Sequence, residues 1–135
     1  MKTIDQLQFI ILNEKGNIIF SDDTLFSVQD LPSTSVFDWS PFVESIFPDL
    51  IKKSNQNKIF TFEKVKTIHH FLNGTYDYSF YKNNQSQIVW VISDCSFFYD
   101  QMTKEQQIRN QKTIEKELLA FSKKTIPTLN LSNAI

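Results

Sequence analysis

The stretch that decides the fold is IVWVISDCS at residues 88–96. Its first half is apolar at every position, which is typical of a strand covered on both faces. A long polar sequence follows at once, and the chain has no Gly or Pro between Ile88 and Thr125. The pattern therefore predicts a buried strand that leads without a turn into a helix over about 96–124. A strain in the strand must then reach the helix, which suits a sensor or relay better than a catalyst.

Other strands are predicted before this one. The segments FTFE at 60–63 and YDYSF at 76–80 alternate between apolar and polar residues. Such alternation predicts half-buried strands of an antiparallel sheet. Nearer the N-terminus, apolar runs at 7–12 and 17–20 flank a turn that contains Gly16. Because glycine readily adopts a positive φ, these two runs are predicted to form a hairpin.

The segment between the hairpin and the later strands carries helix signals. Ser40 followed by Pro41 is a good N-cap and first-turn pair, because the missing N–H of proline would be unpaired there anyway. Apolar residues then recur every four positions on one helical face, at Phe42, Ile46 and Leu50. Pro48 removes a backbone hydrogen bond, so it is expected to kink or restart this helix.

The order of elements is thus two strands, helices, three strands and a helix. It predicts an α+β fold with a five-stranded antiparallel sheet, helices on one face of the sheet and a long C-terminal helix. We expect a domain over residues 1–95, a helix over 96–124 and a tail over 125–135. With 13 Phe among 135 residues, a substantial core is expected, because each buried aromatic removes roughly 150–250 Å² from water.

Composition excludes several classes of protein. The net charge of -1 and the pI near 6.1 give no basic field that would hold nucleic acid. Cys95 is the only cysteine, which excludes an intramolecular disulfide and fits a reducing cytosol. No run is long and apolar enough for a secretory signal or a membrane span. The expected location is the cytoplasm, without direct membrane contact.

The predicted C-terminal helix carries one stripe with spacings of 4, 4, 3, 4, 4 and 3. Its members are Tyr99, Thr103, Gln107, Asn110, Ile114, Leu118 and Phe121. This spacing is near the seven-residue repeat of a coiled coil, but the middle of the stripe is polar. Two interpretations remain open: a helix seam that pairs with a second copy, and a solvated helix that lies on its own sheet.

This order of elements resembles the PAS family of sensor domains. Asp94-Cys95-Ser96 stands where that family has an Asp-x-Thr motif, and Ser keeps the hydroxyl group. The likeness is greater for PAS domains of sensor histidine kinases from bacteria of the Bacteroidetes type. It covers about residues 7–119 and includes SIFP at 45–48, YDYSF at 76–80 and QQIRN at 106–110. The resemblance implies a two-component signalling module that forms a homodimer.

Asp94 and Ser96 are the expected signal-relay joint. The first N–H groups of a helix have no partner inside the helix, and a carboxylate or a hydroxyl group can accept their hydrogen bonds. Asp94→Ala is expected to keep the fold and to lose roughly 1 kcal/mol of capping. A change in the strand would then pass through these two residues to the helix.

The sequence gives little support for catalysis or for a cofactor. Adjacent residues of a strand point to opposite faces, so His69 and His70 cannot bind one metal ion. Haem-binding PAS domains place a histidine on a middle helix, and this chain has no histidine between Trp39 and Lys53. Cys95 lacks the Asn-Cys-Arg setting of domains that bind flavin covalently, so a packing role is favoured. We expect no enzyme activity and no metal. The sequence gives no support for haem or for covalently bound flavin, and it names no other cofactor.

A cavity between the helices and the sheet is the remaining candidate site. Its predicted lining is Phe42, Ile46, Phe60, Phe62, Tyr78 and Trp90. Aromatic stripes of this kind more often form plain core. An open cavity would sense a small apolar ligand, whereas a filled one would indicate a structural dimerisation domain without a ligand. A small α+β enzyme of the isomerase or dehydratase type is a third alternative, but such a fold begins with long helices.

Overall fold

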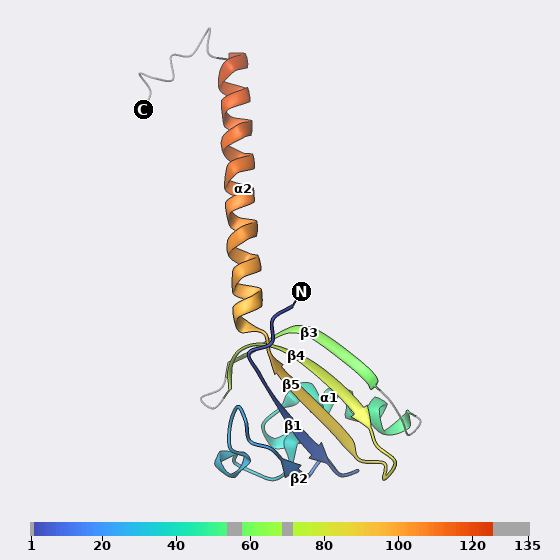
Figure 1. Cartoon of the computed structure of the whole chain (residues 1–135). Coiled ribbons are helices and arrows are strands. Elements are labelled where there is room, and N and C mark those ends of the chain that lie inside the picture. Colours follow the sequence, from blue (N-terminus) through green and yellow to red (C-terminus); the bar gives the residue numbers. More distant parts are fainter. Residues whose placement is uncertain (1, 54–57, 69–71, 126–135) are drawn as a thin grey trace. The chain divides into compact units, whose positions relative to one another are not determined.

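Five strands lie in the part of the chain that the computed structural model describes, residues 2–53, 58–68 and 72–125. They are β1 (Gln6–Leu12), β2 (Ile18–Ser21), β3 (Lys58–Ile68), β4 (Asn73–Lys82) and β5 (Ile88–Asp94). All pair antiparallel in one sheet of order β2-β1-β5-β4-β3 (Figure 1). With the long C-terminal helix, this arrangement confirms the predicted α+β fold. His69, His70 and the predicted tail from 126 onward lie outside the described residues.

The first two strands form the predicted hairpin. Gly16 has a φ of +80° in the turn, and a Cβ atom placed there would come within 2.5 Å of the Phe37 ring. The Oδ1 atom of Asn13 accepts hydrogen bonds from the backbone N–H groups of Lys15 and Asn17. Glycine is therefore required both for the turn and for the close approach of the ring.

Between β2 and β3 the described chain forms two short 3-10 helices and one α-helix. These are η1 (Val28–Asp30), η2 (Val36–Asp38) and α1 (Pro41–Lys52). The Oγ atom of Ser40 accepts a hydrogen bond from the backbone N–H of Val43 at 3.3 Å, so the predicted N-cap is present. The prediction that Pro48 restarts the helix is wrong, because α1 continues through it as one element. Pro48 has no N–H to donate to the carbonyl oxygen of Glu44, and Glu44 is an exposed residue.

Helix α1 buries a face that only partly overlaps the predicted one. Leu50 of the predicted row is fully buried, but Phe42 and Ile46 are only half-buried, and Val43 and Phe47 are buried in their place. The buried row packs with Ile10, Phe80 and Trp90 from the sheet in one hydrophobic cluster. Both rows of α1 are apolar, so the position of the sheet, and not the sequence of the helix, selects the face that is buried.

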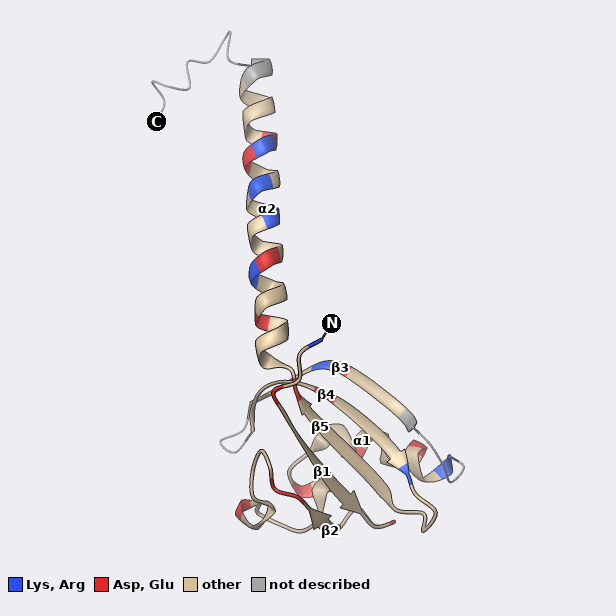
Figure 2. Cartoon of the chain, in the orientation of Figure 1, with Lys and Arg blue, Asp and Glu red and all other residues tan. Residues whose placement is uncertain are grey.

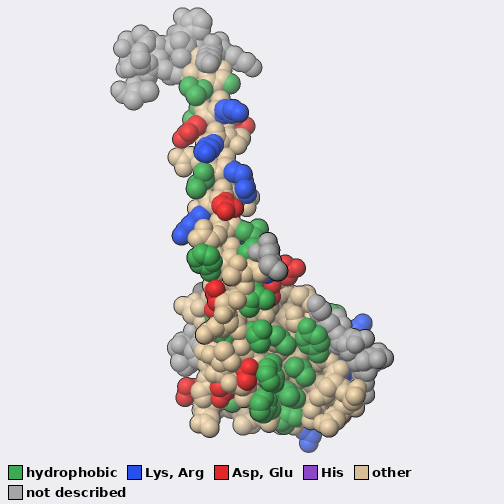
Figure 3. All heavy atoms as spheres, in the orientation of Figure 1, with side chains coloured by type: hydrophobic (Ala, Val, Ile, Leu, Met, Phe, Trp, Pro, Cys, Tyr) green, Lys and Arg blue, Asp and Glu red, His purple; other side chains and the backbone are tan. Residues whose placement is uncertain are grey.

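Helix α1 covers one face of the sheet. No helix from residues 6–52 lies on the opposite face (Figure 1). Alternation along the strands places apolar side chains there: Leu7, Phe9, Ile11, Phe20, Val89 and Val91, which we call the outer face. Leu7 and Phe20 are exposed, and the other four are half-buried. Figure 3 shows hydrophobic side chains gathered over this side of the sheet.

The chain forms two compact units, and the last helix, α2 (Ser96–Thr125), is divided between them. The first unit is Met1–Tyr99 and the second is Asp100–Ile135. The first turn of α2 thus groups with the sheet, and the predicted domain over residues 1–95 stays a prediction. Within the second unit, acidic and basic residues are interspersed along α2 (Figure 2).

Candidate functional site at the junction of the sheet and the last helix

A single residue, Cys95, separates the end of β5 from the start of α2. The carboxylate of Asp94 accepts a hydrogen bond from the backbone N–H of Ser96 at 3.0 Å. Ser96 Oγ in turn accepts one from the backbone N–H of Thr75 at 2.9 Å, and the N–H of Cys95 donates to the carbonyl oxygen of Thr75 at 3.1 Å. The first turn of α2 is therefore bonded to β4 as well as continuous with β5. We call these four residues the joint.

Gly74 allows this close contact between β4 and α2. A Cβ atom at Gly74 would lie 2.5 Å from Ser96 Oγ and 3.0 Å from the hydroxyl oxygen of Tyr76. The backbone of Gly74 does not adopt a positive φ, so conformational freedom is not the reason for glycine here. The reason is space, since any side chain at this position would displace the Ser96 hydroxyl group.

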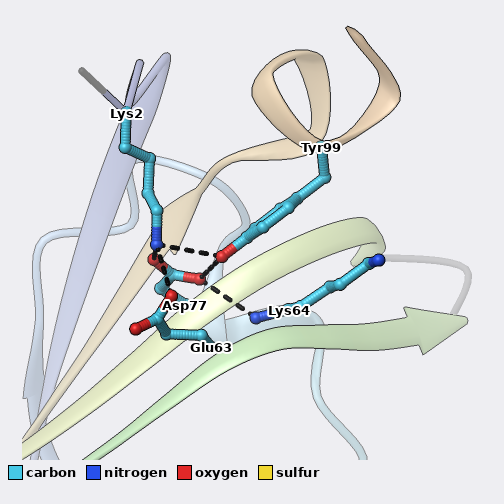
Figure 4. A network of polar contacts seen from close by, with 5 residues as sticks. All are labelled: Lys2, Glu63, Lys64, Asp77 and Tyr99. Carbon is cyan, nitrogen blue, oxygen red and sulfur yellow. Dashed lines mark hydrogen bonds and ion pairs between the residues drawn. The ribbon is translucent and has the colours of Figure 1, made fainter. Parts of the chain in front are cut away.

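A network of charged and polar groups lies beside the joint (Figure 4). The ammonium group of Lys2 donates to Asp77 Oδ2 at 2.7 Å, Glu63 Oε2 at 2.9 Å and the hydroxyl oxygen of Tyr99 at 2.9 Å. The Tyr99 hydroxyl donates to Asp77 Oδ1 at 2.7 Å, and the backbone N–H of Lys64 donates to the same oxygen at 3.1 Å. The network joins the N-terminal segment, β3, β4 and α2.

The charges of this network stabilise one another. Burial tends to raise the pKa of Asp77, but the hydrogen bonds from Lys2 and Tyr99 outweigh that effect and lower the pKa below its usual 3.8. The pKa of Lys2 is raised, first by its hydrogen bond to Asp77 and then by the one to Tyr99. Both groups are therefore ionised at neutral pH.

Cys95 is a packing residue in this structure. Its side chain is fully buried. Burial, followed by the negative charge of Asp77, raises the pKa of the thiol to about 11. A thiol of this kind is almost entirely protonated at neutral pH, and the thiolate is the reactive form.

The predicted helix seam divides into two parts. Tyr99 does not belong to an exposed stripe, because it is only 7% exposed and its hydroxyl bonds to Asp77. Asn110, Ile114, Leu118 and Phe121 are exposed on α2 within the second unit. Pairing of these residues with a second copy stays a prediction.

The predicted cavity lining forms an aromatic cluster. Trp90 stacks on Phe80 with ring centroids 5.9 Å apart and on Trp39 at 5.7 Å. Tyr78 meets Trp90 edge-on at 5.2 Å. The half-buried members are Phe42, Ile46, Phe60 and Phe62, and the buried members are Tyr78 and Trp90. Aromatic rings therefore occupy the space expected for the cavity.

A half-open cavity of about 200 Å³ adjoins this cluster. Of the six predicted residues, Phe42 and Tyr78 line it. The rest of its lining is Trp39, Ser40, Pro41, Val65, Lys66, Thr67 and Leu72. Hydroxyl groups also face this region, since the Thr67 Oγ1 and Tyr78 hydroxyl oxygens share a hydrogen bond at 2.7 Å. The cavity is thus more polar than the expected apolar one.

The sequence did not reveal the polar network. Lys2 and Asp77 are 75 positions apart in the chain, so no local pattern joins them. Asp77 alternates with Tyr76 and Tyr78, which predicts an outward-pointing side chain and nothing more. An available signal for the contact of β4 with the joint was Gly74, an isolated glycine in a strand pattern, which commonly marks a close approach of another chain segment.

Comparisons with protein-family models, curated proteins and solved structures find no match to this chain. In the described residues, no helix combines the length and apolarity that crossing a membrane requires. No three His, Cys, Asp or Glu side chains among those residues gather as a metal site would need.

Proposed function

We propose that the chain is a PAS-like regulatory module of a cytoplasmic signal-transduction protein, of the sensor histidine kinase type. In this proposal, binding of a ligand or a partner biases the packing of the sheet, and the joint passes the bias to α2. The observation that carries the proposal is the pair of backbone contacts of Thr75 in β4, whose carbonyl oxygen accepts from the N–H of Cys95 and whose N–H donates to Ser96 Oγ. These bonds mean that a shift of β4 relative to β5 has to move the first turn of α2.

A small ligand has one place in this proposal. The cavity of about 200 Å³ beside Phe42 and Tyr78 has room for roughly one six-membered ring, since a cavity of about 150 Å³ binds benzene in another protein. Mass spectrometry of gently purified protein tests this part. A molecule of that size that co-purifies in stoichiometric amount supports sensing.

The relay is tested by removing the Ser96 hydroxyl group. Ser96→Ala is expected to change the self-association of the chain, measured by sedimentation equilibrium, or the helix content of α2, measured by circular dichroism. Coupling between sites commonly amounts to about 1–3 kcal/mol, which corresponds to roughly 5- to 150-fold in an association constant. Ser27→Ala is the matched control, because Ser27 Oγ caps η1 in the same unit, away from the joint. Equal effects of the two variants on both readouts would rule out the relay.

The second candidate is a structural homodimerisation module that binds no ligand. It is favoured by the filled aromatic core and by the uncharged outer face. Exposed apolar patches of this kind commonly mark interaction sites. The helix also favours a parallel pair, because the apolar residues Ile114, Leu118 and Phe121 all lie toward one end of the stripe. Only a parallel arrangement brings two such ends together.

Two substitutions that introduce a charge distinguish the outer face from the stripe of α2 as the dimer interface. Val91→Glu places a charge in the outer face, and Ile114→Glu places one in the stripe of α2. The variant that converts a dimer to a monomer identifies the interface, and Gln29→Glu on η1, at an exposed position outside the sheet, serves as the control. A wild-type chain that sediments as a monomer at all accessible concentrations would exclude the homodimer.

A further inference from the structure

The N-terminal segment, residues 2–5, is bound by hydrogen bonds to residues in and beside the joint. The backbone N–H of Asp5 donates to the carbonyl oxygen of Asp94 at 3.0 Å, and the side chain of Lys2 reaches Asp77 and Tyr99. Between these two points Thr3 and Ile4 are exposed. A segment with few buried apolar contacts opens at a low free-energy cost compared with the core strands. Its release would therefore leave the rest of the sheet folded.

The contacts of Lys2 are not all of equal weight. Glu63 is 66% exposed in its pair with Lys2, so solvent screens that interaction and it contributes little. Asp77 is 14% exposed and Lys2 is 28% exposed in the other pair, and their distance is 2.7 Å. Partly buried ion pairs of this geometry are screened far less. The bond to Asp77 is therefore the one that holds Lys2.

Tyr99 links this ion pair to the helix. Its hydroxyl oxygen accepts a hydrogen bond from Lys2 while its proton goes to Asp77, so the phenol bridges both charges. The ammonium group of Lys2 also lies 5.2 Å from the centroid of the Tyr99 ring, in cation–π contact. All three donors of an ammonium group are used by Asp77, Glu63 and Tyr99. Loss of Lys2 removes an accepted bond from Tyr99 and leaves Asp77 without its opposite charge.

We propose that the N-terminal segment clamps the joint: Lys2 holds Tyr99, and with it the first turn of α2, against Asp77 of β4, and displacement of the segment releases that turn. The N-terminal segment and the first turn of α2 therefore both bind the carboxylate of Asp77. This clamp gives the relay a second input, through the N-terminal segment, and in that respect it rests on the proposed function.

The test is amide hydrogen exchange in Lys2→Met, which keeps the length of the side chain and removes its charge. The backbone N–H of Tyr99, bonded to the carbonyl oxygen of Cys95 at 3.0 Å, is expected to exchange about tenfold faster, as loss of a charge-assisted hydrogen bond implies. The N–H of Trp90 in the core of β5 reports global stability and is expected to stay within about twofold. Lys15→Met, an exposed lysine of the hairpin turn, is the control for lost charge.

Unchanged protection of Tyr99 in Lys2→Met would overturn the clamp. So would equal acceleration of Trp90 and Tyr99, because Lys2 would then only stabilise the unit as a whole. Self-association measured on the same variant keeps the two proposals apart. Faster exchange at Tyr99 with unaltered self-association and helix content supports the clamp and counts against the relay. Unchanged exchange at Tyr99 removes the clamp and leaves the relay to the Ser96→Ala experiment.

Discussion

Replacing Gly74 by alanine tests how tightly β4 and α2 fit at the joint. The added Cβ atom would lie 2.5 Å from Ser96 Oγ, which forces the hydroxyl group to move and breaks its 2.9 Å bond with the N–H of Thr75. That buried N–H then lacks a partner, at a cost of about 1–3 kcal/mol. Crowding against the Tyr76 hydroxyl adds to this, and the lower entropy of the unfolded chain offsets about 0.4–1 kcal/mol. The expected net loss is about 2–3 kcal/mol.

Urea denaturation measures this loss, and a double-mutant cycle identifies its cause. With a slope of about 1.5 kcal/mol/M, the midpoint of Gly74→Ala should fall by about 1–2 M. Ser96→Ala alone removes the same bond to Thr75 and should cost about 1–2 kcal/mol. Because the Ser96 oxygen is then absent and only the crowding against Tyr76 remains, adding Gly74→Ala should cost at most about 1 kcal/mol more. Strictly additive losses, or a stable Gly74→Ala single variant, would show that the reasoning about this contact is mistaken.

Three other residues give separate expectations. Cys95 is buried, and its pKa is raised to about 11. Its thiol should therefore resist alkylation by iodoacetamide at pH 8 in the folded protein and react promptly in urea. Prompt labelling of the folded protein would contradict its packing. Gln8 is fully buried, and its Oε1 atom accepts hydrogen bonds from two loop backbone N–H groups at 2.8 and 2.9 Å. Gln8→Leu should therefore lower the free energy of unfolding, measured in urea, by about 3 kcal/mol. A loss below about 1 kcal/mol would mean that water replaces these bonds. The pKa of Asp77 is lowered on folding, so its stabilisation is complete above about pH 5 and is lost as the pH falls through its folded value. Asp77→Asn should therefore be about 2 kcal/mol less stable at pH 7 and should lose less stability than wild type between pH 5 and pH 2; parallel acid profiles would refute the assignment.

The elements that local patterns specify were predictable. The hairpin around Gly16, the N-cap at Ser40 and the direct passage from β5 to α2 depend on neighbouring residues, and the structure contains all three. The buried face of α1 was not predictable in the same way. The rows that contain Phe42 and Val43 are both apolar and lie about 100° apart on the helix. The choice between them is made by the sheet, whose position the helix sequence does not encode.

The candidate site was predictable only in part. Asp94 and Ser96 stand at a strand-to-helix junction, where the unpaired N–H groups of the first turn call for an acceptor. Their partner Thr75 is 21 positions from Ser96, and the partner of Asp77 is 75 positions away. Contacts over such distances leave no periodic trace in one sequence. Gln8 shows the same limit, because it interrupts an apolar run and yet is fully buried.

The arrangement of the outer face bears on where a signal would enter. Asp77 and Ser79 of β4 pair with Ser93 and Val91 of β5, so Asp77 lies on the same side of the sheet as Val91. A partner that covers the outer face would therefore meet the clamp residues directly. A ligand larger than the cavity of about 200 Å³ would first have to displace rings such as Trp90, and disrupting a core aromatic costs about 3–5 kcal/mol, more than a typical coupling energy of about 1–3 kcal/mol. For any signal larger than about one six-membered ring, the proposed relay thus favours the surface route through the outer face and the N-terminal segment.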